Sequence, residues 1–197
     1  MYSLHSSGGC TLSTSNLRVT AKVLNTQCAS GNGHNAGCNF VDANSTSYGR
    51  GFNMIGGGVF AHLWDDSGIK IWHFARNAIP SDINAQQPDP SCWGTPAAFW
   101  SSASCDISTH FQDHSLVLDI TLCGDLGNPT FPSSGCNGTC ASAVADPTNF
   151  QCEDFLFYTY CTPDHLKQLP RRQMGNELYR RLSVALWRVT GVAVRRE

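Results

Sequence analysis

The chain has 197 residues and a formal net charge of −2 at pH 7, with 41% apolar and only 14% charged residues. This length suits one domain. The composition excludes both a disordered chain and an ordinary helical bundle, and it favours an all-β protein with many polar turns. The sequence lacks a run of about 18 apolar residues, so we expect no membrane-spanning helix.

Charge divides the chain into two unequal parts. Residues 1–160 carry five basic and twelve acidic residues, a net charge of −7, whereas residues 161–197 carry eight basic and three acidic residues, a net charge of +5. We therefore predict a domain over 1–160 and a separate basic tail over 161–197. The acidic domain has no basic patch among its aromatic residues, which argues against nucleic-acid binding.

Ten cysteines are spread among loops rich in Gly, Ser and Asn. An even number in this setting is typical of disulfides in a secreted protein. Cys136 and Cys140 enclose the glycosylation sequon at Asn137, which argues against the alternative of a zinc site. A second sequon begins at Asn44. The first ten residues nevertheless do not form a signal peptide, which conflicts with export.

The strand patterns begin after a polar stretch over 27–56, for which we expect long loops with short pairings. Residues 59–64 and 69–74 flank the turn-forming residues 65–68 and predict a β-hairpin. Residues 79–105 contain four prolines and predict a long surface crossing rather than part of a sheet.

Two further strands are predicted towards the C-terminus. Residues 115–122 alternate apolar and polar side chains, which indicates a half-buried strand. Residues 155–160 form a plausible last strand.

The basic tail has apolar residues at helical spacing, which predicts an amphipathic basic helix. These residues are Leu178, Leu182, Ala185, Leu186 and Val189. Such a helix docks on a membrane surface or a partner, or it is an appended sequence that never packs on the domain. We favour the second interpretation, because the tail shares none of the composition of the domain.

Catalytic patterns are scarce. Glutamate occurs only at Glu153, Glu177 and Glu197. A retaining glycosidase needs two carboxyl groups about 5 Å apart, and none of the predicted strands carries carboxylates at alternate positions. His110 and His114 have the spacing of metal ligands but lack the glutamate of a zinc-protease motif, so a loop is the better interpretation. We predict no metal and no cofactor.

Tryptophan is concentrated in one region, with Trp64, Trp72, Trp93 and Trp100 within 37 residues. Indole rings stack on the CH faces of sugars, but they also fill the cores of β-sandwiches. Spacing alone leaves carbohydrate binding and core packing both open.

A series of motifs in a fixed order resembles the fungal laminarinase-type enzymes of glycoside hydrolase family 16. They are Tyr48-Gly-Arg-Gly-Phe-Asn53, Gly56-Gly-Gly-Val-Phe-Ala61, Trp64-Asp-Asp-Ser-Gly-Ile-Lys-Ile-Trp72, Ile79-Pro-Ser-Asp82, Trp93-Gly-Thr-Pro96, Ser104-Cys-Asp-Ile107, Phe111-Gln112 and Asp119-Ile-Thr-Leu-Cys-Gly-Asp125. The resemblance covers about residues 5–149. It implies a concanavalin-like β-jelly-roll sandwich, secretion, and retaining endo-hydrolysis of β-1,3(4)-glucans.

The hallmark of that family is a Glu-x-Asp-x-x-Glu strand, which the sequence does not contain. In the family this strand precedes the segment that resembles Leu4-His5-Ser6. We therefore expect the C-terminal part of a secreted enzyme, an incomplete sandwich with no catalytic residue and no hydrolytic activity of its own. The alternatives are a non-catalytic β-glucan-binding module and a chain that cannot fold alone.

The resemblance also assigns individual residues. It places His5 near the sugar at the cleavage point and places Asn53 and Trp93 along the cleft, while Trp64 and Trp72 are left between core and cleft. The partner it implies is a β-glucan polysaccharide, and we expect an extracellular monomer. The cysteines expected to form disulfides are Cys10, Cys28, Cys38, Cys105, Cys123, Cys136 and Cys140. Cys92 and Cys152 stand where the family would not have cysteine, so the pairing stays open.

Overall fold

The computed structural model describes residues 1–31, 33–112, 114, 123–133 and 137–146, and the backbone of two strands over 154–161 and 183–190. The predicted strand over 115–122, Cys136 and Cys152 lie outside the described residues.

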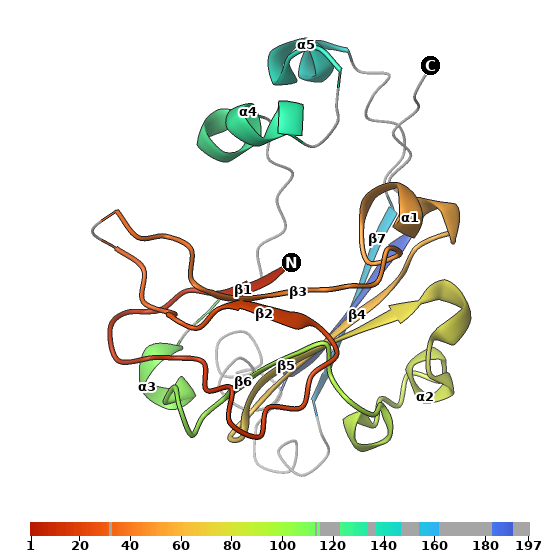
Figure 1. The fold of residues 1–197 in the computed structure, drawn as a ribbon. Coiled ribbons are helices and arrows are strands. Elements are labelled where there is room, and N and C mark those ends of the chain that lie inside the picture. Colours follow the sequence, from red (N-terminus) through yellow and green to blue (C-terminus); the bar gives the residue numbers. More distant parts are fainter. Residues whose placement is uncertain are drawn as a thin grey trace, which may run out of the picture.

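Two antiparallel sheets form two layers (Figure 1), and this confirms the prediction of an all-β fold. The smaller sheet has the order β1 (Tyr2–Leu4), β3 (Cys38–Val41), β2 (Lys22–Asn25). The larger sheet has the order β6 (Ala98–Ser101), β5 (Gly68–Ala75), β4 (Gly58–Asp65), β8 (Ser183–Thr190), β7 (Asp154–Cys161).

The predicted hairpin is confirmed as β4 and β5, which pair along their whole length from Gly58↔Ala75 to Asp65↔Gly68. The tight turn needs glycine at its end, because Gly68 has a φ of +136° and a side chain there would collide with the carbonyl oxygen of Trp100. The strand predicted over 155–160 is likewise confirmed as β7, but it is not the last strand, because β8 follows it.

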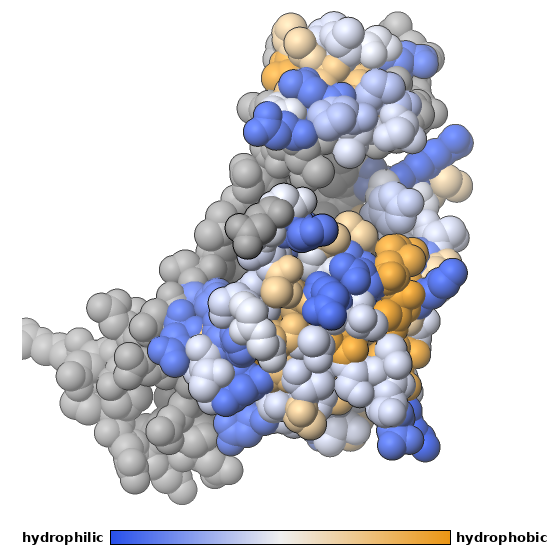
Figure 2. Space-filling model, turned by 60° about the vertical axis from the view of Figure 1, so that its left-hand side comes forward, coloured by the Kyte–Doolittle hydropathy of each residue, from blue (hydrophilic) through white to orange (hydrophobic). Residues whose placement is uncertain are grey.

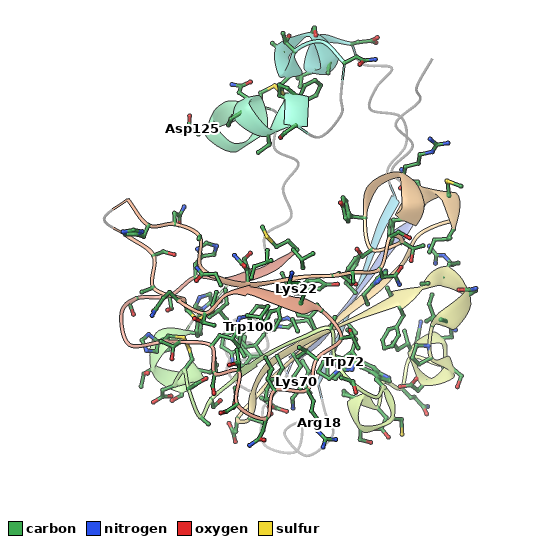
Figure 3. All side chains as sticks on the ribbon, viewed as in Figure 1. Arg18, Lys22, Lys70, Trp72, Trp100 and Asp125 are labelled. Atoms are coloured by element: carbon green, nitrogen blue, oxygen red, sulfur yellow. A yellow bond between two sulfur atoms is a disulfide. The ribbon has the colours of Figure 1, made fainter. Side chains whose placement is uncertain are left out.

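The main core lies between the two sheets. Phe40 of β3 is completely buried and meets Trp100 of β6 edge to face, with ring centroids 5.1 Å apart. Figure 3 shows Trp100 between the layers. Tyr2 and Leu4 enter this core from β1, and Ile69 enters it from β5.

A second core covers the opposite face of the larger sheet. Val59, Ala61 and Leu63 of β4 alternate with the residues that face the main core, as a strand with two buried faces requires. The segment after β5, which contains α2 (Ser81–Asn84), contributes Ile83 and covers this face. The sandwich is therefore flanked by a third apolar layer at this position.

Short helices and one strand depart from the predictions for the loops. The prediction that 79–105 stays outside the sheets is wrong for β6, which pairs with β5 from Gly68↔Ser101 to Ile71↔Ala98. The other elements are α1 (Gly49–Met54), η1 (Arg76–Ala78), η2 (Pro90–Cys92), α3 (Ile107–His110), α4 (Gly124–Ser133) and α5 (Cys140–Ala145).

The tail does not form the predicted helix where it is described. Residues 183–190 are the strand β8, whose backbone pairs with β4 from Gly58↔Val189 to Trp64↔Ser183 and with β7 on its other side. The same residues satisfy both a helical and a strand period, and the free edge of β4 decides for the strand because its N–H and C=O groups need partners. Leu178 and Leu182 lie outside the described residues.

Disulfides link the described part of the chain, which confirms the expectation of a disulfide-linked protein. Cys10–Cys105 ties the start of the chain to the segment after β6, Cys28–Cys38 closes the loop between β2 and β3, and Cys123–Cys140 joins α4 to α5. None of the described helices is long and apolar enough to cross a membrane.

Candidate functional site

The outer side of the smaller sheet carries several polar residues, and β2 also exposes Leu24. Tyr2 and Leu4 point into the core, so Ser3 lies on the opposite side of β1, and His5, which directly follows β1, is exposed. The pairs Ser3↔Asn39 and Asn25↔Asn39 bring two asparagines onto this same face. A polar outer face on a sandwich sheet is a suitable surface for a hydrophilic ligand.

His5 stands at one end of this face and is held by the loop over residues 28–38. Its Nδ1 is 2.8 Å from Oγ of Ser30. Its ring also lies close to Gly37, where an added Cβ would be 2.9 Å from both Nδ1 and Cε1. The side chain is exposed, so its other nitrogen, Nε2, can meet a ligand.

The two asparagines bind the same loop to the sheet. Nδ2 of Asn25 donates to the carbonyl oxygen of Gly37 at 2.8 Å, and Nδ2 of Asn39 donates to that of Ala36 at 3.1 Å. Asn39 is only 6% exposed, and its Oδ1 is buried without a hydrogen-bond partner among the described residues. The loop and the outer face thus form one connected polar cluster.

The other expected cleft residue, Asn53, belongs to α1. Figure 1 shows α1 and the loop between β2 and β3 towards opposite ends of β3. Phe52 of α1 packs against Phe60 and His73 of the larger sheet, with ring centroids 5.8 Å and 6.2 Å apart. Asn53 is half-buried, and its Oδ1 has no hydrogen-bond partner among the described residues. Tyr48, immediately before α1, is 73% exposed and presents an aromatic ring at this end. No contact described for Asn53 links it to His5, so a shared place along one cleft stays a prediction for these two residues.

Trp93 is not on this face, and the prediction that it lines the cleft is wrong. It is 7% exposed in the second core, meets Trp72 and Phe74 edge to face, and donates from Nε1 to Oδ2 of Asp82 at 2.7 Å. A ring covered in this way cannot stack on a sugar. The sequence alone could not tell whether the indole ring of Trp93 is buried or exposed, because proline-rich segments contain tryptophans of both kinds.

The remaining tryptophans also serve packing. Trp72 is buried and donates from Nε1 to the carbonyl oxygen of Gly94 at 3.1 Å. Trp64 is half-buried, packs against the main core and meets Phe111 edge to face. For both residues the open choice between core and cleft is resolved in favour of packing. Figure 3 shows Trp72 on the larger sheet, away from Lys22 on β2.

A buried polar group joins the two sheets. The hydroxyl of Tyr2 donates to Oδ2 of Asp42 at 2.7 Å, and Nδ1 of His73 is 3.5 Å from the same oxygen. Burial and the neighbouring carboxylate raise the pKa of the Tyr2 hydroxyl. Burial lowers the pKa of His73, an effect that the charge of Asp42 partly opposes. These groups face the interior and tie the sheets together.

Three of the described aspartates, Asp82, Asp89 and Asp106, form hydrogen bonds within loops and at helix ends. Oδ2 of Asp82 accepts hydrogen bonds from the backbone N–H of Asp89 and from Trp93, both at 2.7 Å. The hydroxyls of Ser91 and Ser108 lower the pKa of Asp89 and Asp106 respectively, so both carboxyl groups stay ionised. A general acid needs a raised pKa instead.

Metal ligands do not gather within the described ranges. No group of three His, Cys, Asp or Glu side chains there could hold a metal ion. Nδ1 of His110 is 2.9 Å from Oγ of Ser7, and His114 packs edge to face on Trp64. Each histidine of the pair thus has a partner of its own.

Both sequon asparagines, Asn44 and Asn137, are exposed, as glycosylation requires. Oδ1 of Asn44 accepts hydrogen bonds from the backbone N–H and the hydroxyl of Thr46. Glycosylation at Asn44 and Asn137 stays a prediction.

Cys92 is an exposed free thiol whose Sγ is 3.4 Å from Oδ2 of Asp89.

Sequence reasoning missed Ser30, Asn25 and Asn39. The strands that carry the two asparagines have four residues each, too few to reveal an alternating pattern. Ser30 reaches His5 only because its loop folds back across the sheet. The closely spaced Cys28 and Cys38 were the available signal for such a loop.

Comparison with other proteins agrees with the fold and the motifs. The family model described as "XgeA-like, catalytic GH16 domain" matches residues 1–159. A protein of Schizosaccharomyces pombe named a probable glycosidase is 38% identical over 151 residues, which is 75% of this chain and 36% of the relative. A protein of Aspergillus clavatus named a probable endo-1,3(4)-β-glucanase is 41% identical over 133 residues, 68% of this chain and 20% of the relative. The chain thus spans about a third or less of these relatives.

Solved structures of family 16 proteins are also similar to this chain. The laminarinase 16A of Phanerochaete chrysosporium, solved with β-glucans in its donor and acceptor sites, has a TM-score of 0.68 and 26% identity over 95% of this chain and 56% of that chain. A β-1,3-glucosyltransferase of the same family has a TM-score of 0.64 and 29% identity with the same coverage. The chain belongs to glycoside hydrolase family 16.

Proposed function

We propose that this chain is the β-glucan-binding part of a secreted family 16 glycosidase of the endo-β-1,3(4)-glucanase type. In this proposal the polysaccharide lies along the outer face of the β1-β3-β2 sheet, between the 28–38 loop and α1. The main observation that supports this proposal is the polar cluster of His5, Ser30, Asn25 and Asn39 at that face. The names of the relatives and structural neighbours support β-glucan as the ligand.

We further propose that residues 1–197 bind β-glucan without hydrolysing it. Retaining hydrolysis needs a nucleophilic carboxylate and an acid/base carboxyl on either side of the glycosidic bond. The first glutamate in the sequence is Glu153. The bonds to Asp82, Asp89 and Asp106 support this proposal, because they hold these carboxylates in turns and helix ends. Activity on O-glycosidic bonds then belongs to a longer family member that also has the Glu-x-Asp-x-x-Glu strand.

The second candidate is a non-catalytic β-glucan-binding module that functions by itself and not as part of a glycosidase. It is favoured by the same cluster, because binding alone needs only the outer face. The exposed sequons and the disulfides support an extracellular location in either case. We propose that the protein acts as a monomer.

Affinity electrophoresis tests the binding proposal. We expect native gels that contain laminarin to retard the wild-type chain relative to gels without it. His5→Ala is expected to abolish most of the retardation, because it removes the exposed imidazole ring that follows β1. Trp93→Phe serves as the control and should be retarded normally, since it keeps an aromatic ring in the core. Equal mobility of the wild type with and without laminarin would refute the proposed ligand.

A further inference from the structure

The orientation of His5, which directly follows β1, is set by a neighbouring loop. An exposed histidine ordinarily samples several rotamers. Here Nδ1 is 2.8 Å from Oγ of Ser30, and the ring edge fits above Gly37. Gly37 has a φ of +63°, and a side chain there would also lie 2.6 Å from the carbonyl oxygen of Leu4. Glycine at this position therefore leaves the space that the ring occupies.

The loop is anchored independently of His5. The backbone N–H of Ser6 donates to the carbonyl oxygen of Cys28, and that of Ser30 donates to the carbonyl oxygen of Ser6, both at 2.9 Å. The disulfide Cys28–Cys38 closes the loop at its base. These bonds fix Ser30 beside β1 before any contact with the ring is counted.

The contact between Nδ1 and Oγ fits two arrangements, in which the hydroxyl either accepts from Nδ1–H or donates to Nδ1. When the hydroxyl donates, the proton of a neutral imidazole lies on Nε2. Nε2 then becomes a hydrogen-bond donor with a defined direction. Sugar hydroxyl and ring oxygens accept such bonds, and a donor that is already oriented loses less entropy on binding.

We propose that Ser30, carried by the disulfide-closed 28–38 loop, is a positioning residue that holds His5 in its Nε2–H tautomer, ready to donate to a glucan oxygen. This inference rests on the proposed function, because it assumes that the outer face binds β-glucan. Ser30 acts through His5 and does not itself touch the sugar. Gly37 contributes the space and the disulfide contributes the rigidity.

Nitrogen-15 NMR of the histidine side chains tests the positioning without any ligand. In the wild type, the His5 shifts are expected to show a protonated Nε2 and an unprotonated Nδ1. Ser30→Ala should give averaged shifts from a mixture of tautomers, and Ser30→Thr, which keeps the hydroxyl, should restore the wild-type spectrum. Ser15→Ala, at another exposed serine, is the matched control and should leave the His5 shifts unchanged.

Titration with laminarihexaose then links positioning to binding. One hydrogen bond contributes about 0.5–1.5 kcal/mol, so Ser30→Ala is expected to raise the Kd about 2- to 12-fold, with recovery in Ser30→Thr. If Ser30→Ala changes neither the His5 shifts nor the Kd while His5→Ala still weakens binding, the positioning role is wrong and the proposed function stands. If the wild type does not bind laminarihexaose, the proposed function fails, and the tautomer measurement still decides the role of Ser30.

Discussion

At the scale of single residues, His62 and His73 on the face of the larger sheet towards the smaller sheet are expected to make stability depend on pH. His73 stacks on Phe60 with ring centroids 4.8 Å apart, and burial lowers its pKa, with the nearby Asp42 partly opposing this. Burial also lowers the pKa of His62. Both rings are therefore best accommodated in their neutral form.

The sign of the pH effect follows from linkage. The unfolded chain takes up protons on these histidines near their ordinary pKa of about 6.5, whereas the folded chain resists protonation until a lower pH. The contribution of these two histidines to the free energy of unfolding should thus be complete above about pH 6.5. It should decrease as the pH falls below that value.

We predict that urea denaturation gives a smaller free energy of unfolding at about pH 5.5 than at about pH 7.5. His62→Gln should reduce that difference, because the new side chain does not titrate. His34→Gln, at an exposed histidine, is the control and should keep the wild-type dependence. A pH dependence that is identical in the wild type and His62→Gln would show that His62 does not contribute.

At the scale of elements, the disulfides differ in how much of the chain they constrain. Cys10–Cys105 spans a sequence separation of 95 residues, and Cys28–Cys38 spans 10. Cross-links stabilise the fold mainly by restricting the unfolded chain, so the longer loop should matter more.

We predict a larger loss of stability for the double variant Cys10→Ala, Cys105→Ala than for Cys28→Ala, Cys38→Ala. For separations of 95 and 10 residues the chain-entropy model gives about 4.7 and about 2.7 kcal/mol respectively. Denaturation of the two double variants in parallel measures the difference. Equal losses would mean that strain or residual structure outweighs the loop length.

The elements that sequence analysis predicted share strong local signals. The β4–β5 hairpin combines two alternating runs with a turn that ends in Gly68, so its pattern can be recognised without the rest of the fold. β6 follows a proline-rich stretch and has four residues, which gives too little pattern to predict. The tail strand β8 was mistaken for a helix because the edge of β4 that selects a strand is not visible in the local sequence.

The candidate site was predicted only in part, for a related reason. His5 and Asn53 came from resemblance to a family, and their place along a glucan cleft stays a prediction. Ser30 and Asn39 act through a loop that folds back across the sheet, and this contact spans 25 residues from His5 to Ser30. Trp93 was misplaced because its hydrogen bond to Asp82 and its burial depend on tertiary packing.

At the scale of the whole molecule, two cores and the disulfides Cys10–Cys105 and Cys28–Cys38 stabilise the described sheets. The polar cluster around His5 lies outside both cores. Figure 2 shows one side of the molecule, where hydrophilic residues surround an apolar patch. A stable scaffold with a separate polar face can bind a ligand without a complete catalytic apparatus. Binding and hydrolysis should therefore be separable in this protein.

The release of reducing ends from laminarin by the purified chain tests this separation most directly. The chain is incubated at a concentration comparable to that of the polysaccharide, with buffer alone and a complete family 16 laminarinase as the two references. We predict the same number of reducing ends as in buffer, because the proposed site binds glucan without a pair of catalytic carboxyl groups. Release above buffer that persists through repurification and is lost on substitution of a single aspartate would contradict the account.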